Sequence, residues 1–226
     1  MKKDLPQSLT YYYKNIECLL ENWKPKKIYC CLRDTLIKTS IHKPRIWINL
    51  DNEPEIDFRD VYIMPFVTFK DSNSRIFQYK FLNNILVNKY WLKKWKLEDD
   101  DLCNFCKNES ETQMHLFWEC EHTKLFWNEF ELFCQKYGID FNILQSKNLI
   151  LIGTNQKHDI LNILIIKAKQ YIQLCRDKQI KLNFKGFLEY LKHFAHIEFL
   201  VAKNKGTCAL TKFLERWDKI INVINM

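Results

Sequence analysis

The chain has 226 residues, of which 47% are hydrophobic and 15% aromatic, so it can bury a sizeable core and should not be disordered. Its 4 glycines and 5 prolines are too few for the many turns of a large sheet, and they favour long helices. The 35 Lys and Arg residues exceed the 27 Asp and Glu residues, and the net charge of +8 suits a polyanionic partner without identifying one.

No segment of the sequence predicts secretion or membrane insertion. Met1 is followed by charged residues and by Pro6, without the apolar stretch of a signal peptide. The most apolar window, residues 160–166, is interrupted by Asn162 and is too short to cross a bilayer. Nine cysteines without a leader indicate a reducing compartment. We therefore expect an intracellular protein, nuclear or cytoplasmic, that is not secreted and has no membrane partner.

The N-terminal region, residues 1–66, carries helical patterns. Apolar residues recur at helical spacing over 9–23, and a second such pattern covers 25–39. A short helix follows and is expected to end near Pro65, because proline interrupts the backbone hydrogen bonds of a helix. The sequence predicts an N-terminal helical region.

The second region, residues 67–138, is predicted to be a helical hairpin followed by a small metal site. Asp71 is a typical N-terminal cap, and the apolar run that it begins continues to Leu86. Asn88 begins a shorter helix, and an amphipathic helix over 123–137, ended by Gly138 in the left-handed conformation, closes the region.

The third region, residues 139–226, is predicted to be helical as well. Helices are expected at about 159–181, 184–202 and 207–223, and residues 148–153 form the only plausible strand. We expect the outer side of the first of these helices to carry Lys167, Lys169, Arg176, Lys178 and Lys181.

One segment carries a metal-binding pattern. Cys103, Cys106, His115 and Cys120 have the spacing C-x2-C-x8-H-x4-C. Three thiolates and one imidazole form a closed tetrahedral set that suits a structural zinc ion. The alternative is unrelated residues in a chain with nine Cys and six His. His122 is a minor alternative to His115 as ligand, although its C-x-H step is cramped. We predict a mainly α fold in which helical bundles flank a small CCHC zinc knuckle.

A candidate nucleic-acid contact precedes this segment. Its residues are four lysines, Lys89, Lys93, Lys94 and Lys96, and three aromatic residues, Tyr90, Trp91 and Trp95. Lysines can follow a phosphate backbone while aromatic rings stack on bases. The alternative is an amphipathic helix with its aromatic residues in the core and its lysines in water. We favour this alternative for the aromatic residues, whereas the lysines fit either interpretation.

Other chemistry has weak support. The acidic run 98–101 is interpreted as a solvated turn, because charge runs usually face water. The sequence has no glycine-rich phosphate loop, no G-x-S-x-G and no H-E-x-x-H. A thiolate in a closed zinc site has no open coordination position for catalysis. We therefore expect no enzyme activity.

The zinc segment resembles the reverse transcriptase zinc-binding region at the C-terminal end of LINE-type (non-LTR) retrotransposon polyproteins. The matching residues are Cys103, Cys106, Glu111, Thr112, His115, Leu116, Phe117, Cys120, Phe126 and Trp127. The resemblance extends from about 70 to 180. Asn104, Phe105 and Lys107 stand where family members often have Pro and Gly.

The resemblance implies a region downstream of the polymerase, because the palm with its apolar Tyr/Phe-x-Asp-Asp hairpin is missing. It implies zinc as cofactor, template RNA or target DNA as ligand with RNA favoured, and no polymerase activity in this chain itself. The remaining retroelement polymerase is a candidate partner. The alternatives are a zinc-stabilised structural or protein-interaction module and an inert retroelement remnant.

Overall fold

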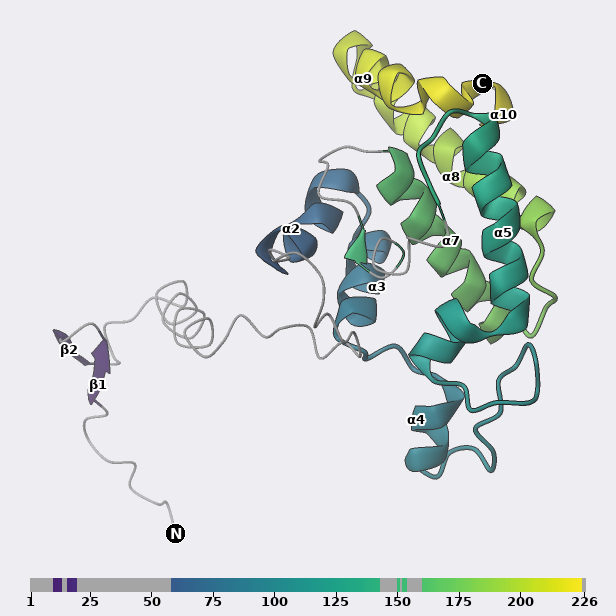
Figure 1. Ribbon diagram of the computed structural model, residues 1–226. Helices are drawn as coiled ribbons and strands as arrows, with labels where there is room; N and C mark the ends of the chain where they lie inside the picture. The colour runs from purple at the N-terminus through teal and green to yellow at the C-terminus, as the bar shows by residue number, and fades with distance from the viewer. Residues whose placement is uncertain are drawn as a thin grey trace. The chain divides into compact units, whose positions relative to one another are not determined.

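The computed structural model describes part of the chain, namely residues 10–13, 16–19, 58–142, 150, 152–153 and 160–224. The chain divides into two compact units, 1–43 and 44–226. Each unit is described by itself. The second unit is built of helices, which confirms the predicted mainly α fold (Figure 1).

The described residues of the first unit form a small antiparallel pair of strands. Strand β1 covers Thr10–Tyr13 and strand β2 covers Ile16–Leu19. Thr10 lies opposite Leu19, and Tyr13 lies opposite Ile16.

These strands contradict the helix predicted over 9–23. Three consecutive tyrosines and an isoleucine favour strands, and cross-strand pairing outweighed the apparent helical periodicity. The helix predicted over 25–39 lies outside the described residues.

The second unit begins with a helical hairpin and a short helix. Helix α2 covers Phe58–Thr68, α3 covers Ser72–Leu82 and α4 covers Lys89–Lys94. The predicted end of α2 near Pro65 is wrong, because the helix continues past it. Phe69 still donates its N–H to the Pro65 carbonyl over 3.0 Å, so Pro65 removes only its own donor from the helix.

The two predicted helix caps are confirmed. The Asp71 side chain accepts a hydrogen bond from the Ser74 N–H at 2.7 Å, and that of Asn88 accepts one from Trp91 N–H at 3.1 Å. Each cap satisfies a backbone donor that has no partner within the helix. Helix α3 ends at Leu82, earlier than predicted.

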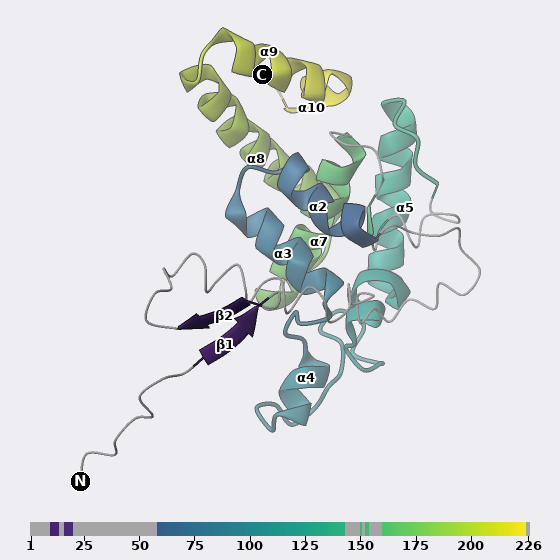
Figure 2. The ribbon, with the colours of Figure 1, turned by 90° about the vertical axis from the view of Figure 1, so that its left-hand side faces the viewer.

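Further helices among the described residues follow in the bundle. They are α5 (Glu121–Lys136), α7 (Ile160–Asp177), α8 (Phe184–Asn204), α9 (Thr207–Trp217), the 3-10 turn η4 (Asp218–Ile220) and α10 (Ile221–Ile224). Helix α7 lies between α3 and α8, and α5 packs against α8 (Figures 1 and 2). Gly186 permits the close approach of α8 to α7, since a Cβ at this position would collide with the Tyr171 hydroxyl.

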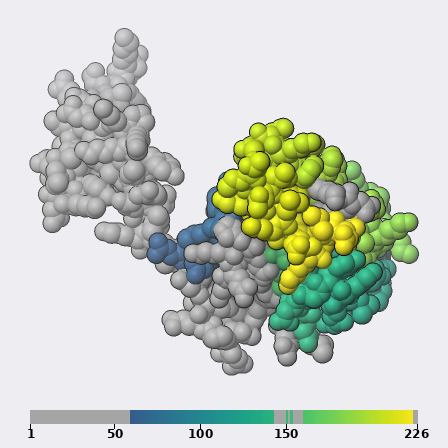
Figure 3. Space-filling view, turned by 90° about the horizontal axis from the view of Figure 1, so that it is seen from above, coloured from purple at the N-terminus to yellow at the C-terminus, as the bar shows by residue number. Residues whose placement is uncertain are grey.

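The C-terminal helices close one end of the bundle. Helices α9 and α10 fold back on α8, and Figure 3 shows them in yellow beside α5 in teal. Lys219 in η4 donates to the Gly138 carbonyl at 3.0 Å. Gly138 follows α5 with a positive φ of 62°, as its predicted role at the helix end requires. Of the helices described, none combines the length and apolarity that a membrane span needs.

One continuous core runs through the second unit. It joins Met64 of α2, Phe117 near the metal site, Trp127 of α5 and Trp217 of α9. The predicted second and third regions, divided at 138, share this core.

Two predictions for the third region are wrong. Ile150 and Ile152 are helical and buried, so the strand predicted over 148–153 is wrong at these two positions. Lys167, Lys169 and Arg176 are buried within the bundle, because neighbouring helices enclose α7 on more than one side. An apolar run with interspersed lysines does not reveal how many sides of a helix are covered.

Candidate metal centre

The first two cysteines lie in a short loop that closes on itself. Leu102 and Ser110 form an antiparallel β-bridge at its base. The Cys103 N–H donates to the Glu109 carbonyl at 2.8 Å. These contacts fix both ends of the loop, so the position of Cys103 is set by local backbone hydrogen bonds.

A tight turn brings the second cysteine back beside the first. The Lys107 N–H donates to the Cys103 carbonyl at 3.0 Å, and Lys107 itself adopts a positive φ of 59°. The Phe105 N–H lies 3.4 Å from Cys103 Sγ as a hydrogen-bond donor. A donor directed at the sulfur favours its thiolate form, which is the form that binds a metal.

The other two ligands come from a widened helical turn. The element η2, His115–Glu119, has the Cys120 N–H bonded to the His115 carbonyl five residues earlier, at 2.8 Å. On a regular α-helix, side chains five residues apart diverge by about 140°. The wider turn reduces this divergence, so both side chains reach the cysteine loop. The Thr112 hydroxyl accepts from the His115 N–H at 3.0 Å and fixes the start of the turn.

The four predicted ligands gather at one point. Their ligand atoms lie within 4.8 Å of one another, which brings together Cys103, Cys106, His115 and Cys120. The Cys103 and Cys120 sulfurs are 4.0 Å apart, and Cys106 Sγ is 3.3 Å from His115 Nε2. Tetrahedral zinc with ordinary bond lengths would separate two sulfurs by about 3.8 Å and a sulfur from a nitrogen by about 3.6 Å. The donor set and its spacing therefore fit a zinc ion.

The surroundings of the ligands support this assignment. Cys103, His115 and Cys120 are buried, and Cys106 is half-buried. A Glu109 carboxylate oxygen lies 3.0 Å from His115 Nδ1. A carboxylate at Nδ1 leaves Nε2 for the metal, as is usual for zinc-binding histidines. His122 is exposed and stands outside the cluster, so the alternative ligand is excluded.

The two buried thiols of Cys103 and Cys120 are hydrogen-bonded to each other. The pKa of Cys103 is raised, first because its thiol donates a hydrogen bond to Cys120 and second because it is buried. The pKa of Cys120 is lowered by the same hydrogen bond, which stabilises its thiolate. A zinc ion would replace the proton of this hydrogen bond, so metal binding releases protons and strengthens as pH rises.

A buried carboxylate joins the cysteine loop to two helices. Glu111 Oε2 accepts from the Asn104 N–H at 2.9 Å, and Oε1 accepts from the Lys89 N–H at 2.9 Å. Oε1 also accepts from Arg176 Nη2 at 2.6 Å and Nε at 2.8 Å. The Asn104 side chain in turn donates to the Arg176 carbonyl at 3.2 Å. Glu111 thus connects the metal loop, the start of α4 and the end of α7.

Charges at this junction are paired. Burial alone would lower the pKa of Arg176, but the carboxylates of Glu111 and Asp177 raise it above its usual range. The guanidinium therefore stays charged beside the fully buried Glu111 carboxylate. Site prediction from sequence missed this pair. The only signal was the position of Glu111 within the Glu-Thr-x-x-His pattern.

The acidic run after α4 is not simply a solvated turn. Asp100 pairs with Lys89 at 3.2 Å, and Asp101 pairs with Lys93 at 2.7 Å. Asp101 also accepts from the Ser110 hydroxyl at 2.8 Å. The run therefore ties α4 to the metal loop. The pKa of Asp101 is lowered, chiefly by its hydrogen bond with Lys93. The pKa of Asp100 is lowered as well, chiefly by the hydrogen bond that it accepts from the Leu102 N–H.

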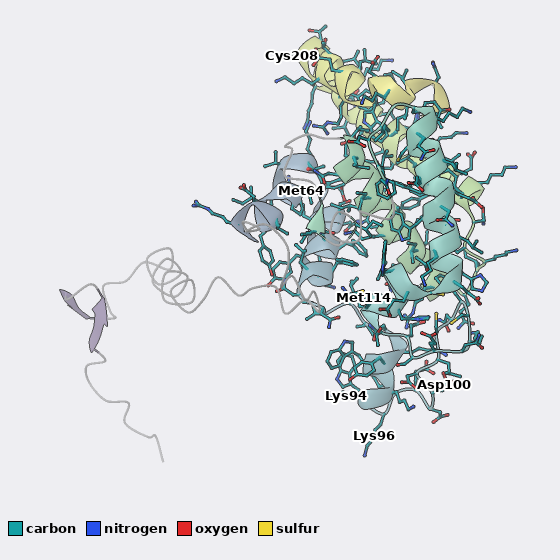
Figure 4. The ribbon with its side chains drawn as sticks, in the orientation of Figure 1. Met64, Lys94, Lys96, Asp100, Met114 and Cys208 are labelled. Atoms are coloured by element: carbon teal, nitrogen blue, oxygen red, sulfur yellow. The ribbon has the colours of Figure 1, made fainter. Side chains whose placement is uncertain are left out.

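We define the α4 knob as residues 88–97, which project beside the metal loop. The prediction that its aromatic side chains enter the core is wrong, since no residue of α4 is buried. Tyr90 is 40% exposed and Trp95 is 53% exposed. Lys94 and Lys96 lie at the outer end of the knob, with Asp100 on the opposite side (Figure 4).

A group of three cysteines and one histidine, all within reach of one ion, has the composition of a structural zinc site within a helical protein. Residues 60–127 match the family described as zinc-binding in reverse transcriptase. The matched segment is similar to that family, and it contains all four ligands and the α4 knob. No curated protein matches the chain. The LINE-type origin and the missing palm stay predictions.

Proposed function

We propose that the chain is a zinc-binding nucleic-acid-binding module, with RNA favoured over DNA, whose α4 knob contacts the ligand. One observation carries this proposal. Helix α4 buries no residue, yet it is held in place at several points. Its first N–H is bonded to buried Glu111, and its lysines Lys89 and Lys93 pair with the following acidic run. A helix that buries no residue, yet is held in place beside a metal site, is well suited to contact a ligand.

Zinc would act as a structural element in this function. The ligands Cys103, Cys106, His115 and Cys120 would hold the ion, fold the cysteine loop and thereby position Asn104, Glu111 and α4. Comparable zinc peptides gain roughly 10–16 kcal/mol on metal binding. The closed ligand set leaves no position for a substrate, so the proposal assigns binding and no polymerase activity to this chain. Template RNA, target DNA and the remaining retroelement polymerase are the proposed partners.

A titration of labelled RNA tests this proposal. The zinc-loaded chain is added to a fluorescent single-stranded RNA, and anisotropy is followed from low to physiological salt. We expect affinity to fall as salt rises, because lysine contacts release counterions from the RNA. K94Q/K96Q should weaken binding more than K178Q/K181Q, which removes the same charge from exposed lysines beyond α7. Equal effects of the two variants would contradict a contact at the knob.

A protein-interaction role is the second candidate. Exposed apolar side chains on and after α2 and α3 favour it, namely Ile63, Phe66, Ile76, Tyr79 and Ile85. Such residues are common at protein interfaces when they form one patch. If no RNA or DNA changes the anisotropy even at low salt, the nucleic-acid proposal fails and this candidate, or an inert remnant, takes its place.

A further inference from the structure

The α4 knob exposes aromatic rings in a unit that buries other tryptophans completely. Trp127 and Trp217 are 0% exposed within the same unit, whereas Trp95 is 53% exposed. Burying apolar surface stabilises a fold by roughly 25 cal/mol per Å², so an exposed indole forgoes a considerable contribution. The exposed ring therefore calls for a ligand with an apolar, flat surface.

The two tryptophans of the knob already form a short stack. Trp91 and Trp95 lie one helical turn apart, with ring centroids 6.0 Å apart and planes inclined by 25°. Tyr90 contacts Trp91 edge-on at 5.4 Å, and the Lys94 ammonium lies 5.0 Å from the Trp91 ring centre. Trp91 is half-buried among these neighbours, so Trp95 is the accessible end of the stack.

The charged side chains beside the stack are lysines, and two of them are paired with carboxylates. Lys89 and Lys93 are paired with Asp100 and Asp101. Within the described residues, Lys94 and Lys96 have no carboxylate partner, and they flank Trp95 in sequence. Cations next to an exposed ring suit a ligand that offers both phosphates and flat bases.

We propose that the α4 knob binds unpaired nucleotides by stacking a base on Trp95, so that its ligand is a single strand and not a duplex. This inference rests on the proposed nucleic-acid function and specifies its ligand. Bases inside a duplex already stack on both faces and cannot receive a ring from a short surface helix. An unpaired base has a free face, and its phosphates are within reach of the two neighbouring lysines.

The anchoring of the knob favours such binding. Asn88 caps the helix, Glu111 holds its first N–H, and Lys93 is bonded to Asp101. The helix that carries Trp91 is therefore held in place before the ligand arrives, so less of the knob has to become ordered on binding.

The test uses the full zinc-loaded chain with a labelled single strand and with a duplex of the same sequence, in RNA and in DNA forms. W95A should weaken single-strand binding by about 5- to 150-fold, the range seen when one stacking ring is removed. W95F should recover part of the loss because it keeps an aromatic face. L132A is the matched control, since Leu132 is exposed and apolar but has no ring and lies on α5 outside the knob, and it should bind like the wild type.

Salt dependence gives an independent measure. Single-strand contacts contribute a slope of about −0.7 per neutralised phosphate in a plot of log K against log salt. Two available lysines on the knob therefore predict a contribution of about −1.4, and K94Q/K96Q should remove it while K89Q/K93Q should not. Zinc content and thermal unfolding of each variant confirm that the fold is intact.

The outcomes separate this inference from the proposed function. Unchanged single-strand affinity in W95A, together with weaker binding in K94Q/K96Q, overturns the stacking inference and leaves nucleic-acid binding intact. Duplex binding as tight as single-strand binding also overturns it, as does an equal loss in W95A and L132A. Failure of every nucleic acid to bind removes both proposals.

Discussion

Helices α4 and α7 distribute their side chains in opposite and unusual ways. Helix α7 buries the basic residues Lys167, Lys169 and Arg176, whereas the α4 knob exposes Trp95 and Tyr90. Each of these buried basic side chains has a specific hydrogen-bond acceptor, and Lys94 lies over the half-buried Trp91 ring in the knob. The difference shows that residue type did not decide burial here. What decided it was whether neighbouring helices covered the position.

The metal site should connect the two helices most strongly. C103S or H115A should release zinc, lower helix content and separate α4 from α7, because zinc peptides gain roughly 10–16 kcal/mol from the metal and a whole domain is stable by only about 5–15 kcal/mol. Metal analysis and circular dichroism measure both effects. The wild type should hold about one zinc per chain, while C208S, at an exposed cysteine outside the cluster, should change neither property. Retention of zinc by C103S would contradict the assigned ligands.

Glu111 should be the next largest contributor. E111A leaves the Arg176 guanidinium buried without its main partner, so we expect a loss of about 3–5 kcal/mol in the free energy of unfolding. Denaturant titration measures it. E121A removes an exposed carboxylate and serves as the control. Adding R176M to E111A should restore part of the stability, because an apolar pair leaves no unpaired buried charge. No recovery would indicate that Glu111 acts mainly through Asn104 and Lys89.

Lys167 should make stability depend on pH. Burial lowers its pKa to about 8 although Asp71 and Glu198 raise it, so the unfolded chain binds this proton more tightly than the folded chain. The contribution of Lys167 to the free energy of unfolding is therefore constant below about pH 8. Between about pH 8 and 10.5 it becomes more favourable to the folded state by roughly 3 kcal/mol.

Comparison with K167M isolates this contribution. The difference in unfolding free energy between wild type and K167M should shift in favour of the wild type as pH rises through this range. A flat difference would show that the ammonium is not destabilised by burial. The Lys167 contacts with Ser74 at 2.8 Å and with the Phe194 ring at 3.5 Å would then suffice to keep it charged.

The paired lysines of α4 should have the smallest effect. Lys93 and Asp101 form an exposed ion pair, and such pairs add little to stability. K93Q should leave the thermal unfolding temperature and the salt slope of RNA binding nearly unchanged, whereas K94Q should reduce the steepness of that slope by about 0.7. A steep loss of slope in K93Q would mean that RNA displaces Asp101 from the lysine.

Much of the local structure followed from the sequence. The caps at Asp71 and Asn88, the end of α5 at Gly138 and the four-ligand cluster were predicted, because each depends on residues close together in the chain. The strands β1 and β2 and the helical conformation of Ile150 were not, because short apolar runs suit helix and strand alike until a partner selects one.

The sequence by itself determined the helical character of the second unit and the chemistry of its metal site. A set of three cysteines and one histidine at close spacing needs only local turns to converge. The tertiary structure alone decided that α7 is enclosed, that Glu111 meets Arg176 across 65 positions of sequence, and that the rings of α4 remain in solvent. The physical reason is that burial and ion pairing depend on which helices cover a residue, and that information is spread over the whole fold.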